Sequence, residues 1–228
     1  MLVVCVGTAT DIGKSWVGEQ VLSAARAAGI SVAARKPAQS FDPGETGPTD
    51  AMVLARATGQ AVDEVCPPHR SYPVAMAPPM AAEALALPVP VLRDLVEETV
   101  WASPRAELRW VESVGGVRSP VAADADSVDL CDALKPDLVV LVADAGLGTI
   151  NSVRLSAAAL SGHDLAVFLN RFQPADSLHA ANLCWLKDRD EYRVLSTMPE
   201  LVSLVSGRAG AGPPDPHRPR AARSRPSG

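Results

Sequence analysis

The chain has 228 residues, of which 47% are hydrophobic and 4% aromatic, and a net charge of −5 at pH 7. This composition fits a single domain with a substantial core, and the negative charge argues against a nucleic-acid-binding protein, whose affinity depends on neutralised phosphates. The apolar runs are too short to cross a membrane, no secretory signal is recognised, and four widely spaced cysteines predict neither a disulfide framework nor a zinc site. We therefore expect a soluble cytoplasmic protein with reduced, mostly buried thiols and no membrane partner.

Strand-like and helix-like segments alternate along the chain. Six apolar runs are predicted to be strands: 2–6, 31–35, 108–112, 138–143, 165–170 and 192–196. Helical patterns cover 14–29, 49–59 and 90–102, and a further helix is expected to begin near Ile150. Thr49 is the predicted N-cap of the second helix, Gly29 and Gly59 are predicted stop signals, and Pro90 is expected in the first turn of the third helix. The alternation predicts a doubly wound α/β fold with a mostly parallel sheet and helices on both faces.

The segment Gly7–Ser15, with the sequence GTATDIGKS, lies between the first predicted strand and the first predicted helix. It is close to the phosphate-loop pattern, except that five residues instead of four separate Gly7 from Gly13. In such a loop Lys14 would pair with nucleotide phosphates and Ser15 would help to hold Mg²⁺. The simpler alternative is a glycine turn followed by a surface lysine. With this loop, residues 1–205 are predicted to form one phosphate-loop α/β domain, and the Arg/Pro-rich residues 206–228 a disordered tail.

Further polar residues stand where predicted strands end, and ligands collect at the carboxyl ends of parallel strands. Lys36 is one of only four lysines in the chain, and the following proline keeps it extended. Glu112 ends an apolar strand, where an unpaired carboxylate is costly. Mg²⁺ would neutralise it, so Ser15, Asp50 and Glu112 form a predicted metal-binding set. Asp50 could instead serve only as a favourable charge at a helix start, and Lys36 as a solvated strand-end cation.

Two later segments repeat this arrangement. The glycine-rich sequence GLGTIN, residues 146–151, precedes a predicted helix, whose N-terminus can bind an anion. An ordinary capped loop would have the same composition. Asn170 ends a strand, and its amide could hydrogen-bond the edge of a nucleobase, although a turn role is equally compatible with the sequence.

In their order and spacing, the segments VGTATDIGKS, RKPAQS, TDA, VESVGGVRSPV, GLGTIN, FLN and STMPE resemble the ATP-dependent dethiobiotin synthetase family. The resemblance covers roughly residues 1–205, and the phosphate loop of that family has the same five-residue gap. It implies a homodimer that joins CO₂ to 7,8-diaminononanoate in biotin biosynthesis, with ATP as co-substrate and Mg²⁺ as cofactor. An amine of the substrate would become a carbamate, ATP would phosphorylate the carbamate, and the second amine would close the ureido ring with release of phosphate.

The resemblance also implies roles for individual residues. Those implied to bind ATP are Thr10, Asp11, Gly13, Lys14, Ser15, Asn170, Pro199, Glu200 and Leu201. Those implied to hold Mg²⁺ are Ser15, Asp50 and Glu112. Lys14 and Lys36 are implied to be catalytic, because they would stabilise charge on the carbamate and the transferred phosphoryl group. Those implied to bind the diamine are Ser40, Gly115, Gly148, Thr149, Ile150, Asn151 and Asn182, of which Gly148 to Asn151 would reach across the dimer.

The chain departs from the family pattern at several places, which include Arg118 close behind the loop that follows Glu112 and Ser152 at a position where a histidine is common. Ser113-Val114-Gly115-Gly116 stands where the family usually has Gly-Ala-Gly-Gly, and the tail is expected to replace the family's final helix. The altered Ser113-Val114 sequence leaves open a catalytically weakened, nucleotide-binding paralogue with a regulatory role. A cobyrinate-amidotransferase-like ATP domain is a further alternative, but it would need a glutaminase domain for which no residues remain. A partitioning ATPase would carry an additional lysine early in its loop, where this chain has none.

Overall fold

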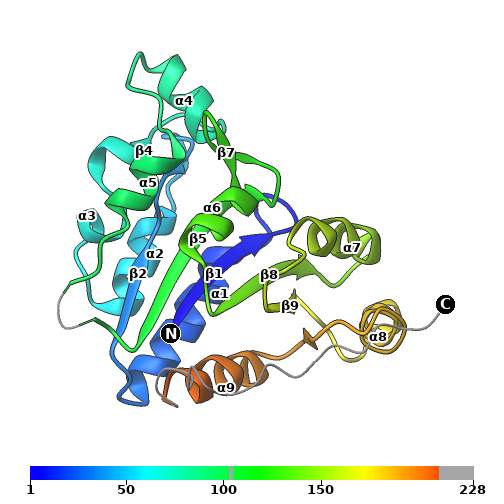
Figure 1. The fold of residues 1–228 in the computed structure, drawn as a ribbon. Helices are drawn as coiled ribbons and strands as arrows, with labels where there is room; N and C mark the ends of the chain where they lie inside the picture. Colours follow the sequence, from blue (N-terminus) through cyan, green and yellow to red (C-terminus); the bar gives the residue numbers. More distant parts are fainter. Residues whose placement is uncertain (103–104, 211–228) are drawn as a thin grey trace.

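The computed structural model describes residues 1–102 and 105–210. Their centre is a six-stranded sheet in the order β10-β9-β8-β1-β5-β2, in which every neighbouring pair is parallel (Figure 1). Its strands are β1 (Leu2–Gly7), β2 (Val32–Arg35), β5 (Leu108–Gly116), β8 (Leu138–Asp144), β9 (Leu165–Asn170) and β10 (Val194–Leu195). All six predicted strands are present, and the predicted α/β fold with a parallel sheet is confirmed.

Helices connect the strands and cover the sheet. They are α1 (Lys14–Ala27), α2 (Asp50–Thr58), α3 (Val62–Val65), α4 (Pro78–Ala84), α5 (Leu92–Glu98), α6 (Ser127–Leu134), α7 (Thr149–Ala159), α8 (Ser177–Cys184) and α9 (Met198–Ala209). Shorter elements are a turn of 3₁₀ helix, Pro68–Arg70, a turn of π-helix that continues α8, Trp185–Arg189, and two small strand pairs, β3 (Gln39–Ser40) with β4 (Ser71–Tyr72) and β6 (Pro120–Ala122) with β7 (Ala125–Asp126). Within the described part of the chain, no helix combines the length and apolarity that crossing a membrane requires.

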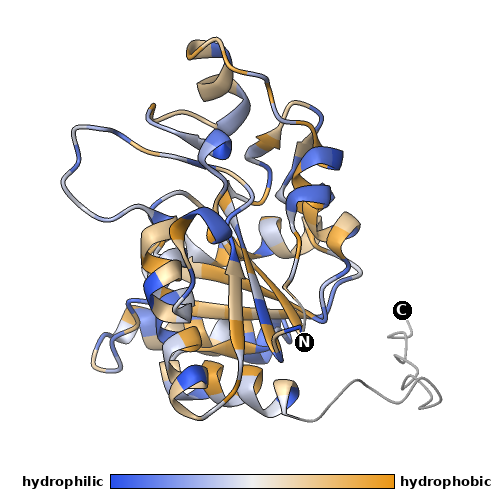
Figure 2. Ribbon diagram, turned by 90° about the vertical axis from the view of Figure 1, so that its left-hand side faces the viewer, coloured by the Kyte–Doolittle hydropathy of each residue, from blue (hydrophilic) through white to orange (hydrophobic). Residues whose placement is uncertain are grey.

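The alternation of side chains along β1 creates two hydrophobic layers. Val3 and Cys5 face one layer, which α1, α2 and α9 complete, while Leu2, Val4 and Val6 face the other layer under α6, α7 and α8. Because both faces are covered, the strands are mostly apolar, as Figure 2 shows for the centre of the fold, and β5 is an exception with Glu112 and Ser113 buried inside it. The sheet is therefore the buried frame that fixes where the strand ends lie.

A third, smaller cluster extends the fold beyond the carboxyl ends of the strands. Tyr72, Ala81, Leu95 and Val121 pack there, between α4, α5 and β6. In Figure 1 this part carries α4 to the top of the view. Residues 75–78 lead into α4 and end with its first residue. The cluster holds them over one side of the cavity described below.

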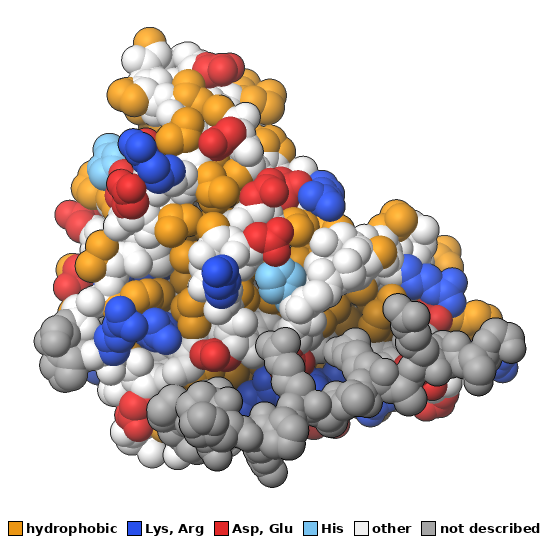
Figure 3. Space-filling model, viewed as in Figure 1, with side chains coloured by type: hydrophobic (Ala, Val, Ile, Leu, Met, Phe, Trp, Pro, Cys, Tyr) orange, Lys and Arg blue, Asp and Glu red, His pale blue; other side chains and the backbone are white. Residues whose placement is uncertain are grey.

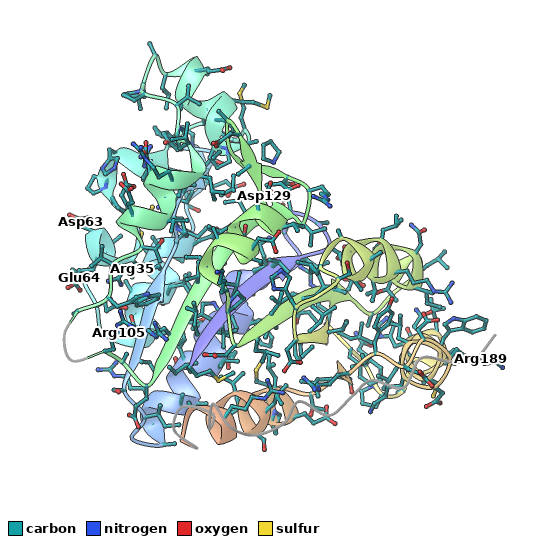
Figure 4. All side chains as sticks on the ribbon, in the orientation of Figure 1. Arg35, Asp63, Glu64, Arg105, Asp129 and Arg189 are labelled. Carbon is teal, nitrogen blue, oxygen red and sulfur yellow. The ribbon has the colours of Figure 1, made fainter. Side chains whose placement is uncertain are left out.

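The Arg35 side chain at the end of β2 contacts Val100 and Trp101, which follow α5. The Arg35 guanidinium lies 4.9 Å from the ring centroid of Trp101, and the Arg109 guanidinium lies 5.7 Å from the same centroid. Arg35 Nε also donates to Val100 O at 2.9 Å. Figure 4 shows Arg35 on this side of the sheet, with Glu64 of α3 nearby. The backbone edge of β2 is met by other groups, because Ala34 N donates to Gln60 Oε1 and Lys36 N donates to Val65 O, both at 2.7 Å.

Several predicted helix boundaries are confirmed, but both ends of the third predicted helix, 90–102, are wrong, since α5 covers only Leu92–Glu98. The Thr49 hydroxyl accepts a hydrogen bond from Met52 N, and Gly59 ends α2 in the left-handed conformation, as predicted. The third predicted helix begins at Leu92 instead of Pro90. Pro90 lies in the preceding extended segment, where its carbonyl accepts a hydrogen bond from Ala123 N.

The expectation that an unstructured tail begins at residue 206 and replaces a final helix is corrected by α9. This helix runs to Ala209 because Leu201, Val205 and Ala209, spaced four residues apart, all face the core. The remainder of the predicted tail, residues 211–228, lies outside the described residues. All four cysteines are free thiols, and Cys184 is exposed while the other three are buried.

Gly18 gives a test of the packing between α1 and its neighbours. A Cβ at this position would lie 2.9 Å from both Leu54 Cδ2 and Trp110 Nε1. We expect Gly18→Ala to lower the unfolding free energy by about 1–3 kcal/mol, because overpacking outweighs the better helix propensity of alanine. Gly207→Ala in α9 is the matched control, since a Cβ there meets no described atom within 4 Å, and it should raise stability by about 0.5–1 kcal/mol. Urea unfolding measures both changes, and a stabilised Gly18→Ala variant would contradict the packing.

Candidate active site

The loop between β1 and α1 depends on two glycines. Gly7 ends β1, and a Cβ there would lie 2.9 Å from Ile12 Cγ2 and 3.0 Å from Ala9 O. Gly13 has a φ of +92° directly before α1, and a Cβ there would clash with Asn170 Nδ2. Both positions exclude a side chain, so the backbone can fold closely around the start of the helix.

Asn170, at the end of β9, holds this loop from the side. Its Nδ2 donates to Ile12 O at 2.8 Å, and its Oδ1 accepts from Arg171 N at 2.9 Å. Arg171 reinforces the contact, because its Nη2 donates to Asp11 O at 2.9 Å. Asn170 therefore lies beside the loop as predicted for a nucleotide site, but its amide is already engaged by backbone groups.

Lys14 is the first residue of α1 and is buried across the mouth of the loop. Its Nζ donates to Gly115 O at 3.0 Å and to Ala9 O at 3.3 Å. Burial lowers the pKa of Lys14, and the nearby positive charge of Lys36 lowers it further. The two lysines are therefore close enough to influence each other's charge.

Lys36 follows β2 and is 1% exposed. Its Nζ lies 2.7 Å from Asp50 Oδ2 and 2.7 Å from Glu112 Oε1, and it also donates to Ser113 O at 3.1 Å. Burial opposes the positive charge, but the attraction of the two carboxylates prevails and raises the pKa of Lys36 above its usual value. Lys36 is thus held as an ammonium between two acidic residues.

Ser15 connects the same two carboxylates. Its Oγ lies 2.5 Å from Asp50 Oδ1 and 2.8 Å from Glu112 Oε1. Burial raises the pKa of a carboxyl group and the Lys36 ammonium lowers it, with different results at the two positions. At Asp50, whose side chain is partly exposed, the ammonium prevails and lowers the pKa to about 2. At the fully buried Glu112, burial prevails and raises the pKa.

The three residues predicted to hold Mg²⁺ are therefore brought together, because Ser15 contacts both Asp50 and Glu112. Glu112 Oε2 is buried and has no hydrogen-bond partner among the described residues, so the site has an unused acceptor. Residues 1–102 and 105–210 contain no group of three or more His, Cys, Asp or Glu side chains arranged for a metal. Two carboxylates and one hydroxyl nevertheless fit Mg²⁺, which commonly takes few protein oxygens and completes its shell with water and phosphate.

A cavity of about 700 Å³ opens at the carboxyl ends of β1, β2 and β5. Of the predicted site residues it brings together Thr10, Asp11, Gly13, Lys14, Ser15, Lys36, Ser40, Asp50 and Gly115. Glu112 does not line the cavity and lies behind Lys36 and Ser15, which it contacts. Both lysines thus face one shared space.

Other predicted residues lie elsewhere. Gly148, Thr149, Ile150 and Asn151 begin α7 and do not line this cavity in their own chain. Asn182 Nδ2 donates to Ala145 O and Gly146 O, both at 2.9 Å, and so fastens the loop before α7. Leu201 is fully buried in the core, and the Glu200 carboxylate accepts from Ser196 N and Thr197 N at the start of α9. Neither they nor Pro199 lines a described cavity.

The altered sequence after Glu112 affects the cavity at one position only. Ser113 Oγ is buried and lies 2.5 Å from Ser127 Oγ, so its side chain packs against α6. Val114 and Gly115 line the cavity. Arg118 Nη1 donates to Asp126 Oδ2 at 2.8 Å on the surface.

A second cavity of about 470 Å³ lies on the other side of α1's first turn. Its lining is Gly13, Trp16, Phe168, Leu169, Asn170, Arg171, Phe172, Ser196 and Met198. Sequence analysis missed Trp16, which lines both cavities, although its place directly after Ser15 could have indicated it. The segment 75–78, which the third hydrophobic cluster positions over the strand ends, also lines the first cavity, although the sequence analysis did not name it among the site residues.

The fold and the loop define the class of protein. A parallel sheet whose first strand leads through a glycine-dependent loop into a helix that begins Lys-Ser is a phosphate-loop NTPase fold. A solved DUF1611 family protein from Anabaena variabilis has a similar fold, with a TM-score of 0.51, 15% identity and coverage of 92% of this chain and 57% of that chain. The family model described as an AAA domain matches residues 2–207.

Relatives with similar sequences define the family more closely. The chain is 40% identical over 168 residues to the ATP-dependent dethiobiotin synthetase BioD of Rhodococcus jostii, covering 72% of this chain and 70% of that protein. It is 35% identical over 206 residues to the protein of the same name from Anaeromyxobacter dehalogenans, covering 86% and 90%. The chain belongs to the ATP-dependent dethiobiotin synthetase family, and the resemblance seen in its motifs is confirmed.

Replacing Lys36 with Met is expected to leave the Glu112 carboxyl group buried without its cation. Without the ammonium, the pKa of Glu112 would rise further in the folded state. The folded protein would then keep a proton on Glu112 at pH values where the unfolded chain has released it. The unfolding free energy of the variant would therefore fall as the pH rises above about 4. We expect a loss of about 3–5 kcal/mol in unfolding free energy near pH 8 and a smaller loss near pH 5, measured by urea unfolding.

The double variant Lys36→Met/Glu112→Gln is the control for this experiment. It removes the titrating group, so the stability near pH 8 is expected to recover in part and the difference between the two pH values to disappear. Equal losses at both pH values in the single variant, without recovery in the double variant, would show that Lys36 does not neutralise Glu112.

Proposed function

We propose that this protein is a dethiobiotin synthetase of biotin biosynthesis, which joins CO₂ to 7,8-diaminononanoate and closes the ureido ring while ATP is converted to ADP and phosphate. The observation that carries the proposal is that one cavity is lined both by Lys14 of the phosphate loop and by Lys36, which follows β2. Such a reaction needs no nucleophilic side chain. The reaction depends on holding the carbamate and the phosphoryl group next to each other and on stabilising their negative charge.

Lys14 and the loop backbone are proposed to bind the terminal phosphates of ATP. The Nζ of Lys14 already points across the loop toward the carbonyls of Ala9 and Gly115. A phosphate oxygen in this region would accept hydrogen bonds from the ammonium and from amides at the start of α1, where the helix dipole favours an anion. Its partly desolvated charge would act strongly on a phosphoryl group.

Ser15, Asp50 and Glu112 are proposed to hold Mg²⁺. When bound there, the ion would neutralise nucleotide phosphate charge and orient the terminal phosphate. The unpaired Oε2 of Glu112 and the partly exposed carboxylate of Asp50 support this assignment.

Lys36 is proposed to stabilise the carbamate. One substrate amine would form a C–N bond to CO₂ and lose a proton, and the resulting carbamate oxygen would attack the γ-phosphorus and displace ADP. The second amine would then attack the carbamoyl carbon and release phosphate. The Lys36 ammonium, raised in pKa by two carboxylates, stays charged through these steps and offers a fixed positive group to each oxyanion.

The remaining walls of the cavity fit an aliphatic diamine. Apolar surface comes from Phe41, Met76 and Pro78, and Ser40 lines the same cavity and could make a polar contact. These side chains would accept the carbon chain of the substrate, while its two amines lie toward Lys36 and the phosphate loop.

We further propose that two copies form a dimer in which Gly148 to Asn151 of the partner subunit bind the substrate carboxylate. These residues do not line the cavity of their own chain. Around them Leu147 is 92% exposed and Leu155 is 67% exposed, with Leu178 and Trp185 also exposed. Figure 3 shows hydrophobic side chains at the surface near α7, on the right of the view. Exposed apolar groups of this kind are typical of subunit interfaces.

The alternative of a regulatory, nucleotide-binding paralogue rests on Val114, which lines the cavity where the family has a smaller residue. Incubation with ATP, Mg²⁺, bicarbonate and 7,8-diaminononanoate separates the two, with dethiobiotin measured by mass spectrometry. We expect product that requires all four components. Tight nucleotide binding without product would contradict the synthetase and favour the regulator.

The Lys36→Ala variant tests the role of the second lysine in that assay. We expect kcat to fall by about 10²- to 10³-fold, the effect of losing one preorganised charge-stabilising group. Circular dichroism under the assay conditions confirms that the variant is folded. An unchanged kcat would remove Lys36 from the reaction.

The dimer is tested with Leu155→Glu, which places a charge in the exposed apolar surface of α7. We expect light scattering after size-exclusion chromatography to shift from the mass of two chains toward that of one, with loss of synthetase activity. Met80→Glu, an equally drastic change at an exposed position of α4, should leave the mass unchanged. A wild-type protein with the mass of one chain would contradict the dimer.

A further inference from the structure

Trp16 stands at the junction of the two cavities. It lies in the first turn of α1, directly after Ser15, and its side chain is 48% exposed. The same residue lines the phosphate-loop cavity and the second cavity, and Gly13 is the only other described residue that does so. A large apolar side chain left open to solvent at this junction is positioned for a ligand that spans both spaces.

The second cavity is suited to a flat heterocycle. Its apolar walls include Trp16, Phe172 and Met198, and the buried Phe168 and Leu169 close its base. It adjoins the phosphate loop at Gly13, so a group attached to a bound triphosphate would reach it. Aromatic and thioether side chains pack well against the face of a planar ring.

The polar side chains of this cavity are largely committed to the protein. Asn170 Nδ2 donates to Ile12 O, and its Oδ1 accepts from Arg171 N. The Arg171 guanidinium donates to Asp11 O at 2.9 Å and lies 3.3 Å from Asp144 Oδ2. These contacts hold the loop in place. Because they occupy the polar groups of the cavity, the cavity is better suited to bind the face of a planar ligand ring than its polar edge.

We propose that Trp16 is the nucleobase-stacking residue of this protein, with its indole ring against the face of the base whose triphosphate is bound at Lys14. The proposal rests on the proposed function only in that the phosphate loop binds a nucleoside triphosphate. In this proposal, stacking on Trp16 adds to the nucleotide affinity that the phosphate contacts provide. Stacking of one base on an aromatic side chain contributes enough for its removal to weaken binding by about 5- to 150-fold.

Calorimetry with two ligands tests this assignment. ATP carries a base and inorganic tripolyphosphate does not, so the wild-type protein should bind ATP more tightly than tripolyphosphate in the presence of Mg²⁺. The Trp16→Ala variant should lose about 5- to 150-fold in ATP affinity and bind tripolyphosphate within about twofold of wild type. Trp16→Phe, which keeps an aromatic ring, should retain most of the ATP affinity.

Three outcomes would overturn the proposal. These are an unchanged ATP affinity in Trp16→Ala, an equal loss for both ligands, which would indicate a disturbed helix start, and a wild-type protein that binds tripolyphosphate as tightly as ATP. The dethiobiotin assay is independent of this result. Base-dependent binding through Trp16 without synthetase activity would refute the proposed function and leave the stacking assignment standing.

Discussion

The site is organised by one constraint, which is that the buried Lys36 ammonium and Glu112 carboxylate must neutralise each other. Glu112 lies in the middle of β5, which continues past the predicted strand end to Gly116, and it is fully buried, where an uncompensated charge would cost several kcal/mol. Lys36 Nζ lies 2.7 Å from it and from Asp50, and Ser15 contacts both acids. These four residues come from α1, α2, β5 and the end of β2, so the ion cluster also joins the elements that form the cavity.

This arrangement has a consequence for binding. In the structure the positive charge between the two carboxylates belongs to Lys36, and a metal ion at the same carboxylates would take over that neutralisation. Lys36 would then be free to interact with anionic groups in the cavity that it already lines. If Mg²⁺ binds as proposed, Glu112 would remain compensated while Lys36 interacts with substrate, so the same lysine could stabilise the fold and take part in the reaction.

The sequence allowed the sheet and the loop to be predicted because their signals are local. Strands buried on both faces are mostly apolar, and Gly13 and Lys14 mark the loop by type and spacing. Other features depend on distant contacts. The resemblance implied that Leu201 binds ATP, whereas its side chain packs in the core, and nothing local in the sequence shows that backbone groups occupy both ends of the Asn170 amide. The four-residue spacing of Leu201, Val205 and Ala209 does indicate a helix past residue 205, but the Gly, Pro and Arg content of the segment that follows favours a tail and led to the wrong boundary.

The central claim is that Lys14 and Lys36 act on the same nucleotide phosphate. A crystal structure with Mg²⁺ and a non-hydrolysable ATP analogue tests it most directly. The terminal phosphate is expected about 3 Å from Lys14 Nζ and in the same cavity as Lys36 Nζ, with Asp50 beside the metal. A terminal phosphate bound outside this cavity, or a Lys36 ammonium turned away from the space that contains it, would contradict the account.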